Sequence, residues 1–183
     1  MTEREPLHVV IMGVSGSGKS TVAERLGAVL GWDYAEADTF HPQANKDKMA
    51  AGHPLDDEDR WPWLRALRDW ISSEDAAGRD TITTCSALKR SYRDLLREAA
   101  GRVVFVYLDG TPELLAERIG GRKGHFMPTS LLGSQLETLE VPQPDEDALT
   151  LSITQTPEQL VDAIVAEYDL HGVALANTTL KED

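Results

Sequence analysis

An apolar stretch near the N-terminus runs directly into a glycine-rich segment, and this junction constrains the fold most strongly. Residues 7–12 (LHVVIM) form a nearly continuous apolar run of the kind found in strands buried on both faces. Residues 13–20 (GVSGSGKS) match the pattern G-x-x-x-x-G-K-[ST], and residues 21–31 (TVAERLGAVLG) carry apolar side chains at helical spacing. This order of strand, loop and helix predicts a phosphate-binding loop in an α/β protein.

The residue types of this loop suit the binding of a nucleoside triphosphate. Glycines let the backbone curl so that successive N–H groups face phosphate oxygens, and the helix N-terminus adds a favourable dipole. We expect Lys19 to reach the β- and γ-phosphates, Ser20 to place its hydroxyl on Mg²⁺, and Thr21 to pack or cap one position later. A glycine-rich turn with a stray lysine is the alternative, and the surrounding pattern disfavours it. The expected nucleotide-binding residues of the loop are Gly13, Val14, Ser15, Gly16, Ser17, Gly18, Lys19, Ser20 and Thr21.

Length and charge limit the classes of function. With 183 residues the chain is expected to form one domain, residues 1–183. A formal net charge of -13 argues against nonspecific binding to nucleic acid or to anionic membranes. Cys85 is the only cysteine, so no intrachain disulfide is available, and the N-terminal apolar run is too short for a membrane span. These features predict a cytoplasmic protein.

Further apolar runs alternate with segments of helical length. Strands are expected at residues 34–37, 81–85, 103–108 and 148–153. Such alternation is typical of a parallel sheet with helices on both faces, whose ligands lie at the carboxyl ends of the strands.

A tryptophan-rich segment, residues 60–73, has a helical pattern. Trp63, Leu67, Trp70 and Ile71 fall on one stripe, and Asp56 or Asp57 precedes it as a candidate cap. We interpret the tryptophans as core or dimer contacts in preference to a platform for stacking bases.

Three segments help to choose between classes of phosphate-binding protein. Residues 45–48 (NKDK) lack the aspartate of a guanine-reading N-K-x-D motif, and residues 75–78 (DAAG) follow an amphipathic helix instead of an apolar strand. The strand at 81–85 is followed by basic residues and not by the adjacent acids expected of a motor ATPase. The sequence therefore favours a small-molecule kinase, in which an acceptor hydroxyl must lie in line with the γ-phosphate.

Two acids follow the second expected strand, beside the mouth of the phosphate-binding loop. Asp38 is expected to orient or deprotonate the acceptor hydroxyl, with Glu36 nearby for a metal-bound water. A helix cap is the alternative for Asp38, and a solvated surface acid is the alternative for Glu36.

Three long blocks carry a family resemblance. Residues 38–64 (DTFHPQANKDKMAAGHPLDDEDRWPWL), 85–97 (CSALKRSYRDLLR) and 122–140 (RKGHFMPTSLLGSQLETLE) strongly resemble the gluconate kinases, and the match extends from the phosphate-binding loop to about Pro144. The resemblance implies ATP-dependent phosphorylation of D-gluconate at its 6-hydroxyl. It also implies a three-layer P-loop fold of the nucleoside monophosphate kinase type, with a five-stranded parallel sheet and a moving lid, and usually a homodimer.

A sugar acid as acceptor gives the basic residues a purpose, because its carboxylate calls for an anion clamp and its hydroxyls for hydrogen-bonding groups. Lys89 and Arg93, one helical turn apart, are the candidate clamp. Arg60 is another candidate, with a local ion pair as its alternative. His41 and Lys48 are expected to line the same pocket, although a turn residue and a solvated helix face are their alternatives. Gln135 and His125, from the third block, complete the expected substrate site.

The remaining expectations concern the nucleotide and the C-terminus. A basic, glycine-rich segment at about residues 120–130 suits a lid whose closure would bring Arg118 and Arg122 onto the phosphates, with Arg122 catalytic. Lys123 and His125 at its tip are weaker candidates, and Thr156 and Pro157 suit a turn that holds adenine. Residues 172–183 are expected to be a flexible tail.

Two other functions stay open at this stage. One is a kinase of another small hydroxy acid, of the shikimate type, which also needs a carboxylate clamp. The other is a nucleotide-binding module that has lost phosphoryl transfer.

Overall fold

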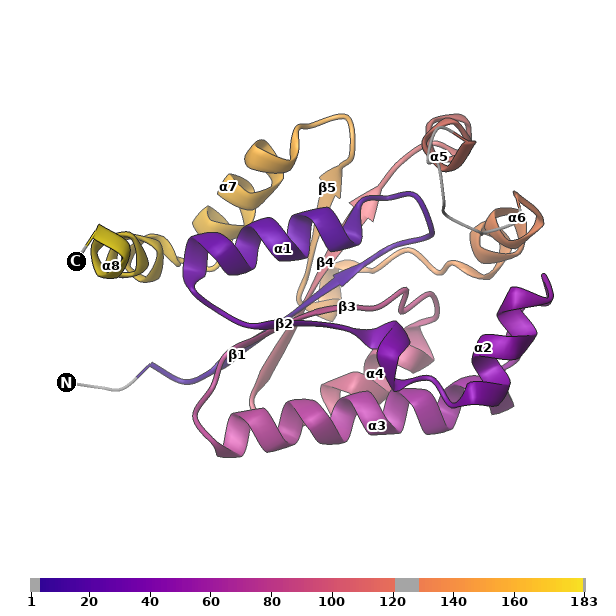
Figure 1. Ribbon diagram of the computed structural model, residues 1–183, viewed down its shortest axis with the longest axis horizontal. Coiled ribbons are helices and arrows are strands. Elements are labelled where there is room, and N and C mark those ends of the chain that lie inside the picture. The colour runs from indigo at the N-terminus through magenta and orange to yellow at the C-terminus, as the bar shows by residue number, and fades with distance from the viewer. Residues whose placement is uncertain (1–3, 121–128, 183) are drawn as a thin grey trace.

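A computed structural model describes residues 4–120 and 129–182, and its centre is a parallel β-sheet (Figure 1). The sheet has five strands in the order β2-β3-β1-β4-β5, with every neighbouring pair parallel. The strands are β1 (Leu7–Met12), β2 (Tyr34–Glu36), β3 (Thr81–Thr84), β4 (Arg102–Asp109) and β5 (Ala148–Ser152). The predicted five-stranded parallel sheet is confirmed, and each strand boundary lies within one residue of its expected position.

Helices cover both faces of the sheet and give three layers. On one face lie α1 (Lys19–Leu30), α7 (Pro157–Glu167) and α8 (His171–Glu182), and on the other lie α3 (Asp57–Ala76) and α4 (Arg90–Arg97) (Figure 1). Near the carboxyl ends of the strands are α2 (Gln43–Ala50), α5 (Pro112–Gly120), α6 (Thr129–Thr138) and the short 3₁₀ helix η1 (Ala37–Phe40), while η2 (Pro144–Glu146) precedes β5. Within the ranges that the structure describes, no helix is both long and apolar enough to cross a bilayer.

The central strands are apolar because neighbouring strands and helices remove them from water on every side. All six residues of β1 and six of the eight in β4 are buried. His8 is the polar exception in β1, and its ring is satisfied by Thr81 Oγ1 at 2.8 Å and Asp75 Oδ1 at 3.0 Å. This rigid centre fixes where the loop after β1 emerges.

The strand order creates a crevice at the carboxyl edge of the sheet. The chain leaves β1 toward β2 and β3 on one side and later adds β4 and β5 on the other side. Loops at such a switch point diverge, and the space between them is where ligands bind in open α/β sheets. The glycine-rich loop after β1 therefore lies at the expected binding edge.

The tryptophan-rich helix α3 begins at a well-defined cap and packs inward. The side chain of Asp56 caps the helix by accepting a hydrogen bond from Asp59 N. The side chain of Asp59 in turn accepts a hydrogen bond from Asp56 N, which completes a capping box. Trp63 is 2% exposed and donates from Nε1 to Ala37 O at 2.7 Å. Trp70 lies beside Phe40, with ring centroids 5.8 Å apart. Trp63 is therefore a core residue as predicted, and Trp70 is partly buried against the core.

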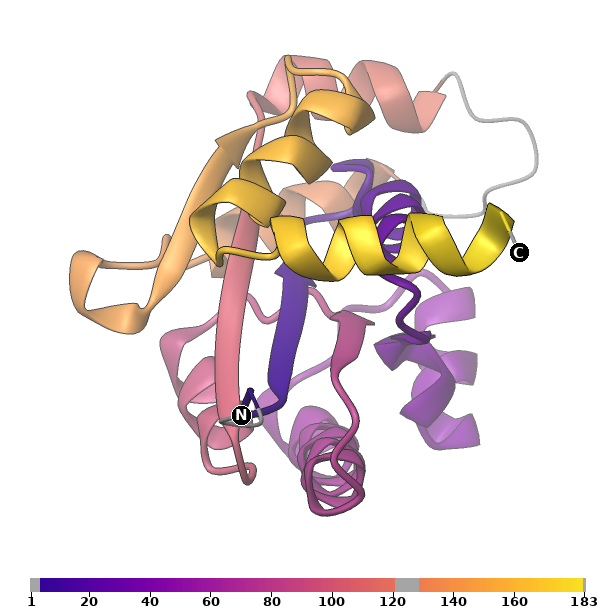
Figure 2. The same ribbon diagram turned by 90° about the vertical axis from the view of Figure 1, so that its left-hand side faces the viewer.

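The C-terminal segment corrects one expectation, because it forms helix α8 instead of an unstructured tail. Figure 2 shows α8 lying beside α1. Asn177 Nδ2 donates to Ala28 O at 2.9 Å and Val29 O at 3.0 Å, so α8 satisfies carbonyls at the end of α1 that have no partner within that helix. Leu175 and Leu180 are 70% and 76% exposed, so α8 does not bury a continuous apolar face.

Candidate active site

The glycine-rich loop is closely wound between β1 and α1. Gly16 and Gly18 have φ values of 83° and 90°, which other residues rarely adopt. A Cβ atom on Gly13 would lie 2.9 Å from Ser17 Oγ and 3.1 Å from Leu108 O, so the loop packs against the end of β4. Lys19 Nζ donates back to Gly13 O at 3.0 Å and Val14 O at 3.1 Å, which places the ammonium group over the concave side of the loop.

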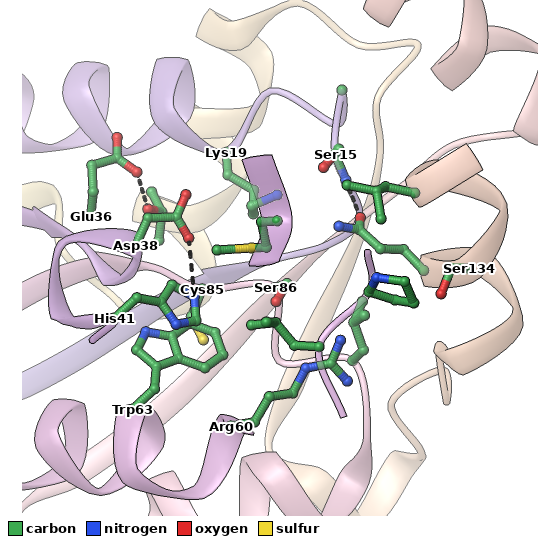
Figure 3. Close-up of a pocket in the computed structure, with 18 of the residues that line it drawn as sticks. Ser15, Lys19, Glu36, Asp38, His41, Arg60, Trp63, Cys85, Ser86 and Ser134 are labelled. Carbon is green, nitrogen blue, oxygen red and sulfur yellow. Dashed lines mark hydrogen bonds and ion pairs between the residues drawn. The ribbon is translucent and has the colours of Figure 1, made fainter. Parts of the chain in front are cut away.

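A cleft of about 170 Å³ opens beside this loop and collects side chains from several parts of the chain (Figure 3). The loop contributes Lys19 and Ser20, and the segment after β2 contributes Asp38 and His41. Its further walls come from α3, from the residues that follow β3 and from α6. The crevice predicted at the sheet edge is therefore a pocket with acidic, basic and aromatic walls.

Asp38 projects from η1 into the mouth of the cleft. Its side chain is 84% exposed to water. Partial enclosure by the cleft walls raises the pKa of Asp38; the charge of Lys19 opposes this rise and that of Glu36 adds to it. The carboxyl group of Asp38 is therefore accessible to a ligand from the mouth of the cleft. Glu36, not Asp38, holds the N-cap position of η1, and Glu36 Oε2 accepts a hydrogen bond from Thr84 Oγ1.

His41 forms an inner wall of the cleft. Its side chain is 3% exposed, its Nε2 lies 3.9 Å from Asp38 Oδ1, and its ring stacks on Trp63 with centroids 4.0 Å apart (Figure 3). Burial, together with the smaller effects of the positive charges of Arg60 and Lys46, lowers the pKa of His41 to about 4. The imidazole is therefore neutral at physiological pH, and it lies in the cleft as the sequence predicted.

Arg60 is a basic side chain of α3 that lines the cleft. Its Nη1 donates to Tyr92 Oη at 2.8 Å, and Tyr92 in turn donates to Asp57. Lys89 Nζ lies 3.1 Å from Asp57 Oδ1, which joins it to the same cluster. Lys89 is not among the lining residues, so Arg60 is the member of this cluster that faces the cleft.

Lys48 also departs from its expected place. Its Nζ lies 2.7 Å from Asp59 Oδ2 and 3.7 Å from Asp56 Oδ2, and it does not line the cleft. The hydrogen bond to Asp59 raises the pKa of Lys48. Because this lysine pairs with the capping acids of α3, it links α2 to α3 instead of facing a substrate.

Arg93 contradicts its expected role as part of an anion clamp. The side chain is 0% exposed and forms an ion pair with Glu146, with Nε to Oε1 at 2.7 Å and Nη2 to Oε2 at 3.2 Å. The remaining nitrogen, Nη1, donates to Ala87 O at 2.9 Å and Leu88 O at 3.3 Å. Because these contacts occupy every guanidinium nitrogen inside the protein, Arg93 supports the loop after β3 and does not face the cleft.

Gln135 is a polar residue of α6 that lines the cleft. Its Oε1 accepts a hydrogen bond from Ser15 N at 2.8 Å, and the residue lines the cleft together with Ser134 (Figure 3). A residue assigned to the substrate from sequence therefore also contacts the phosphate-binding loop.

A second cavity lies on the other side of the loop, where the sequence placed the adenine site. It is lined by Thr21 of α1, Arg118 of α5, Gln155 before α7 and Pro157 at the start of α7. Arg118 Nη2 donates to Ile153 O at 2.7 Å, so the guanidinium is held against the turn after β5. Thr156 accepts from Gln159 N and caps α7, which gives this residue a structural role.

Three candidates in the proposed lid, Arg122, Lys123 and His125, lie outside the described residues. Sequence reasoning also missed residues that the cleft contains. Ser86 follows the end of β3 and lines the cleft, and its position after an expected strand was the available signal. Asn45 contacts His41 from behind, and only the i, i+4 spacing of the pair pointed to that contact.

Comparisons with known proteins identify the family. A family model described as an AAA domain matches residues 9–142. The gluconokinase of Gluconobacter oxydans is 46% identical over 92% of this chain and 98% of its own length. The thermoresistant gluconokinase of Escherichia coli is 44% identical over 85% of this chain and 90% of its own length. This chain belongs to the gluconokinase family.

Solved structures agree with this membership. A sugar kinase from a Janibacter species is 50% identical, with a TM-score of 0.88 over 92% of this chain and 98% of that chain. A gluconokinase from Sinorhizobium meliloti is 44% identical, with a TM-score of 0.80 over 97% of both chains. The APS kinase of Mycobacterium tuberculosis is 17% identical, with a TM-score of 0.67 over 90% of this chain and 98% of that chain. This likeness shows that the chain has the fold of a P-loop kinase.

Proposed function

We propose that this chain transfers the γ-phosphoryl group of ATP to the 6-hydroxyl of D-gluconate, giving 6-phospho-D-gluconate and ADP. The observation that carries the proposal is a cleft in which Asp38 lies near Lys19 in a chain 46% identical to a gluconokinase. Phosphoryl transfer needs an oriented hydroxyl next to a group that offsets phosphate charge, and these two side chains supply both.

The geometry of the loop fits the phosphates of ATP. Residues 13–20 curl around the ammonium group of Lys19, and α1 begins at Lys19, so the N–H groups of its first turn point toward the same space. The triphosphate would lie over this loop between the two cavities. The base would lie beside Pro157 and Arg118 in the second cavity, and the terminal phosphate would point into the cleft toward Asp38.

Mg²⁺ fits the same site through oxygen ligands. No group of three or more His, Cys, Asp or Glu side chains that could bind a metal occurs in the described part of the chain, and Mg²⁺ usually binds through water and phosphate oxygens with few protein ligands. Ser20, which is exposed and lines the cleft, would supply a hydroxyl ligand, and Glu36 would hold a metal-bound water. When bound, the ion would offset the charge that develops on the transferring group.

The acceptor would bind with its carboxylate at one end of the cleft and its 6-hydroxyl at Asp38. Among the basic side chains expected to hold the carboxylate, Arg60 is the one that lines the cleft, and we assign it that role. Gln135 and His41 would contact the hydroxyls between these ends. Arg122 and His125 stay candidates from sequence for closing the site from above.

Assembly and location are part of the same proposal. The family resemblance supports a homodimer, which light scattering coupled to size-exclusion chromatography would detect as twice the mass of 20.1 kDa. The single cysteine, buried in this structure, suits a reducing compartment such as the cytoplasm.

A coupled assay of ADP release with gluconate tests the function directly. We expect turnover with gluconate far above that with water alone, and a lower kcat/KM for other sugar acids and for shikimate. A higher kcat/KM for shikimate would assign the protein to the alternative class of small-acid kinases. ATP binding without acceptor-dependent ADP release would leave a nucleotide-binding module. Lys19→Ala serves as the inactive control.

A further inference from the structure

Asn45 is a buried polar residue of α2 that lies behind the cleft wall and is 4% exposed. Its Nδ2 lies 2.8 Å from Asp59 O and 3.2 Å from His41 Nδ1. A carbonyl oxygen can only accept a hydrogen bond, so the contact with Asp59 O fixes which end of the amide is the nitrogen. The second hydrogen on that nitrogen is then available to His41.

The protonation pattern of His41 follows from this contact. Since Asn45 donates to Nδ1, that nitrogen must carry a lone pair, and the single proton of the neutral ring must be on Nε2. The ring is also held in orientation by its stack on Trp63, at an interplanar angle of 20°, and Trp63 is itself anchored to Ala37 O. Asn45 and Trp63 together therefore present an N–H group toward the cleft.

The acceptor beside this N–H group is Asp38. The distance of 3.9 Å between His41 Nε2 and Asp38 Oδ1 is too long for a good hydrogen bond. It does leave room for one oxygen atom about 2.8 Å from each of the two atoms. A hydroxyl group both donates and accepts, so it can donate to Asp38 and accept from His41 at the same time.

We propose that Asn45 is a positioning residue for the acceptor: by holding His41 as the Nε2–H tautomer, it makes His41 and Asp38 a donor–acceptor pair that binds one hydroxyl of the polyol. The inference rests on the proposed function, because it assumes a polyol in this cleft. In the opposite tautomer, His41 and Asp38 would be two acceptors, and a single hydroxyl hydrogen cannot satisfy both. The charged groups around His41 are Asp38 from η1, Lys46 from α2 and Arg60 from α3.

The tautomer is measured directly by NMR of the protein with ¹⁵N-labelled histidine. We expect His41 of the wild-type protein to show a protonated Nε2 and an unprotonated Nδ1. In Asn45→Asp, at about pH 8 and so above the ordinary pKa of imidazole, the new carboxylate accepts from Nδ1 and the proton moves to that atom. If Asn45→Asp does not fold, Asn45→Ala removes the donor with less disturbance and gives a mixture of the two tautomers.

Kinetics with gluconate and ATP then test the consequence. For Asn45→Asp we expect the KM for gluconate to rise about ten- to a hundredfold, because a polar group of the cleft loses its partner, while the KM for ATP changes less than about twofold. His41→Gln, which carries an amide N–H at a similar reach, should retain more activity than the shorter His41→Asn. Gln43→Ala is the matched control, because Gln43 is exposed on the same helix and its side chain donates to Asp47 Oδ1 at 2.8 Å, on the surface of that helix.

Two results would overturn the inference. One is a wild-type spectrum with the proton on Nδ1 of His41. The other is a reversed tautomer in Asn45→Asp with an unchanged KM for gluconate. Absence of gluconate turnover in the wild-type protein would reject the proposed function instead, and the spectrum would still decide the contact between Asn45 and His41.

Discussion

Arg93 and Glu146 form an ion pair that is wholly buried, with both side chains 0% exposed. Burial alone would raise the pKa of Glu146, but hydrogen bonds from Arg93 and from the backbone of Gln143 reverse that effect and hold it below its usual value. Arg93 also donates to Ala87 O, and Ala87 has a φ of 46° in the left-handed region. The ion pair therefore ties η2 to the loop that carries Ser86 and Leu88 into the cleft.

The first prediction concerns this pair. Arg93→Ala should lower the free energy of unfolding by about 3–5 kcal/mol, because it removes the main ionic partner of a buried carboxylate and leaves only the longer contact with Arg97, at 3.3 Å. Arg90→Ala is the matched control, because Arg90 pairs with Asp145 on the surface, where water screens the interaction, and its removal should cost much less stability. Urea denaturation measures both values. Equal losses for the two variants would contradict the buried pair.

The same arginine shows where sequence reasoning reaches its limit. Glu146 lies 53 residues beyond Arg93, and no local pattern joins the two. The expected pairing of Arg93 with Lys89 assumed that both lie in one helix, but Lys89 is the N-cap, with φ of -100° and ψ of 148°, and it turns toward Asp57. Helical spacing predicts a shared face only for residues inside the helix.

Local signals were sufficient elsewhere. The strands were predictable because a strand buried on both faces must be apolar along its length. The phosphate-binding loop was predictable because its glycines allow the backbone to curl around a phosphate. Asp38 and His41 were found because they follow a strand at the edge where ligands bind. Helix α8 was missed because it is stabilised by hydrogen bonds to α1 more than by a continuous apolar face.

The second prediction separates chemistry from nucleotide binding at Asp38. Asp38→Ala should lower kcat with gluconate by roughly 10²- to 10⁴-fold, because the acceptor hydroxyl loses the carboxylate that orients it and takes its proton. The Kd for ATP, measured by calorimetry, should change little, since Asp38 lies beyond the loop that holds the phosphates. Asp47→Ala, on the exposed side of α2, is the control. Equal losses in ATP affinity and kcat would assign Asp38 to metal binding or folding.

The third prediction concerns acid and follows from the lowered pKa of His41, about 4 against an ordinary 6.5. Between these values the unfolded chain binds a proton that the folded protein excludes, so stability falls as pH decreases from about 6.5 to about 4. The loss from this group approaches about 3 kcal/mol, because each pKa unit corresponds to about 1.4 kcal/mol. Below about pH 4 both states are protonated and the loss stops growing.

A comparison with His41→Gln isolates this contribution from those of other groups. Urea denaturation at about pH 7 and about pH 4.5 gives the stability difference between the two proteins at each pH. We expect wild type to lose stability relative to the variant as the pH falls. A difference that stays constant between the two pH values would mean that His41 titrates normally.

The last prediction tests the packing of α8 on α1. Asn177→Ala should lower the free energy of unfolding by about 1–2 kcal/mol, because Ala28 O and Val29 O at the end of α1 lose a side-chain donor. Thr179→Ala is the matched control, since the hydroxyl of Thr179 donates to Leu175 O at 3.2 Å within its own helix. The kcat with gluconate should be unchanged in both variants, because α8 lies beside α1 at the end of that helix farthest from the phosphate-binding loop. A loss of activity at full stability in Asn177→Ala would instead mean that α8 acts on the site through α1.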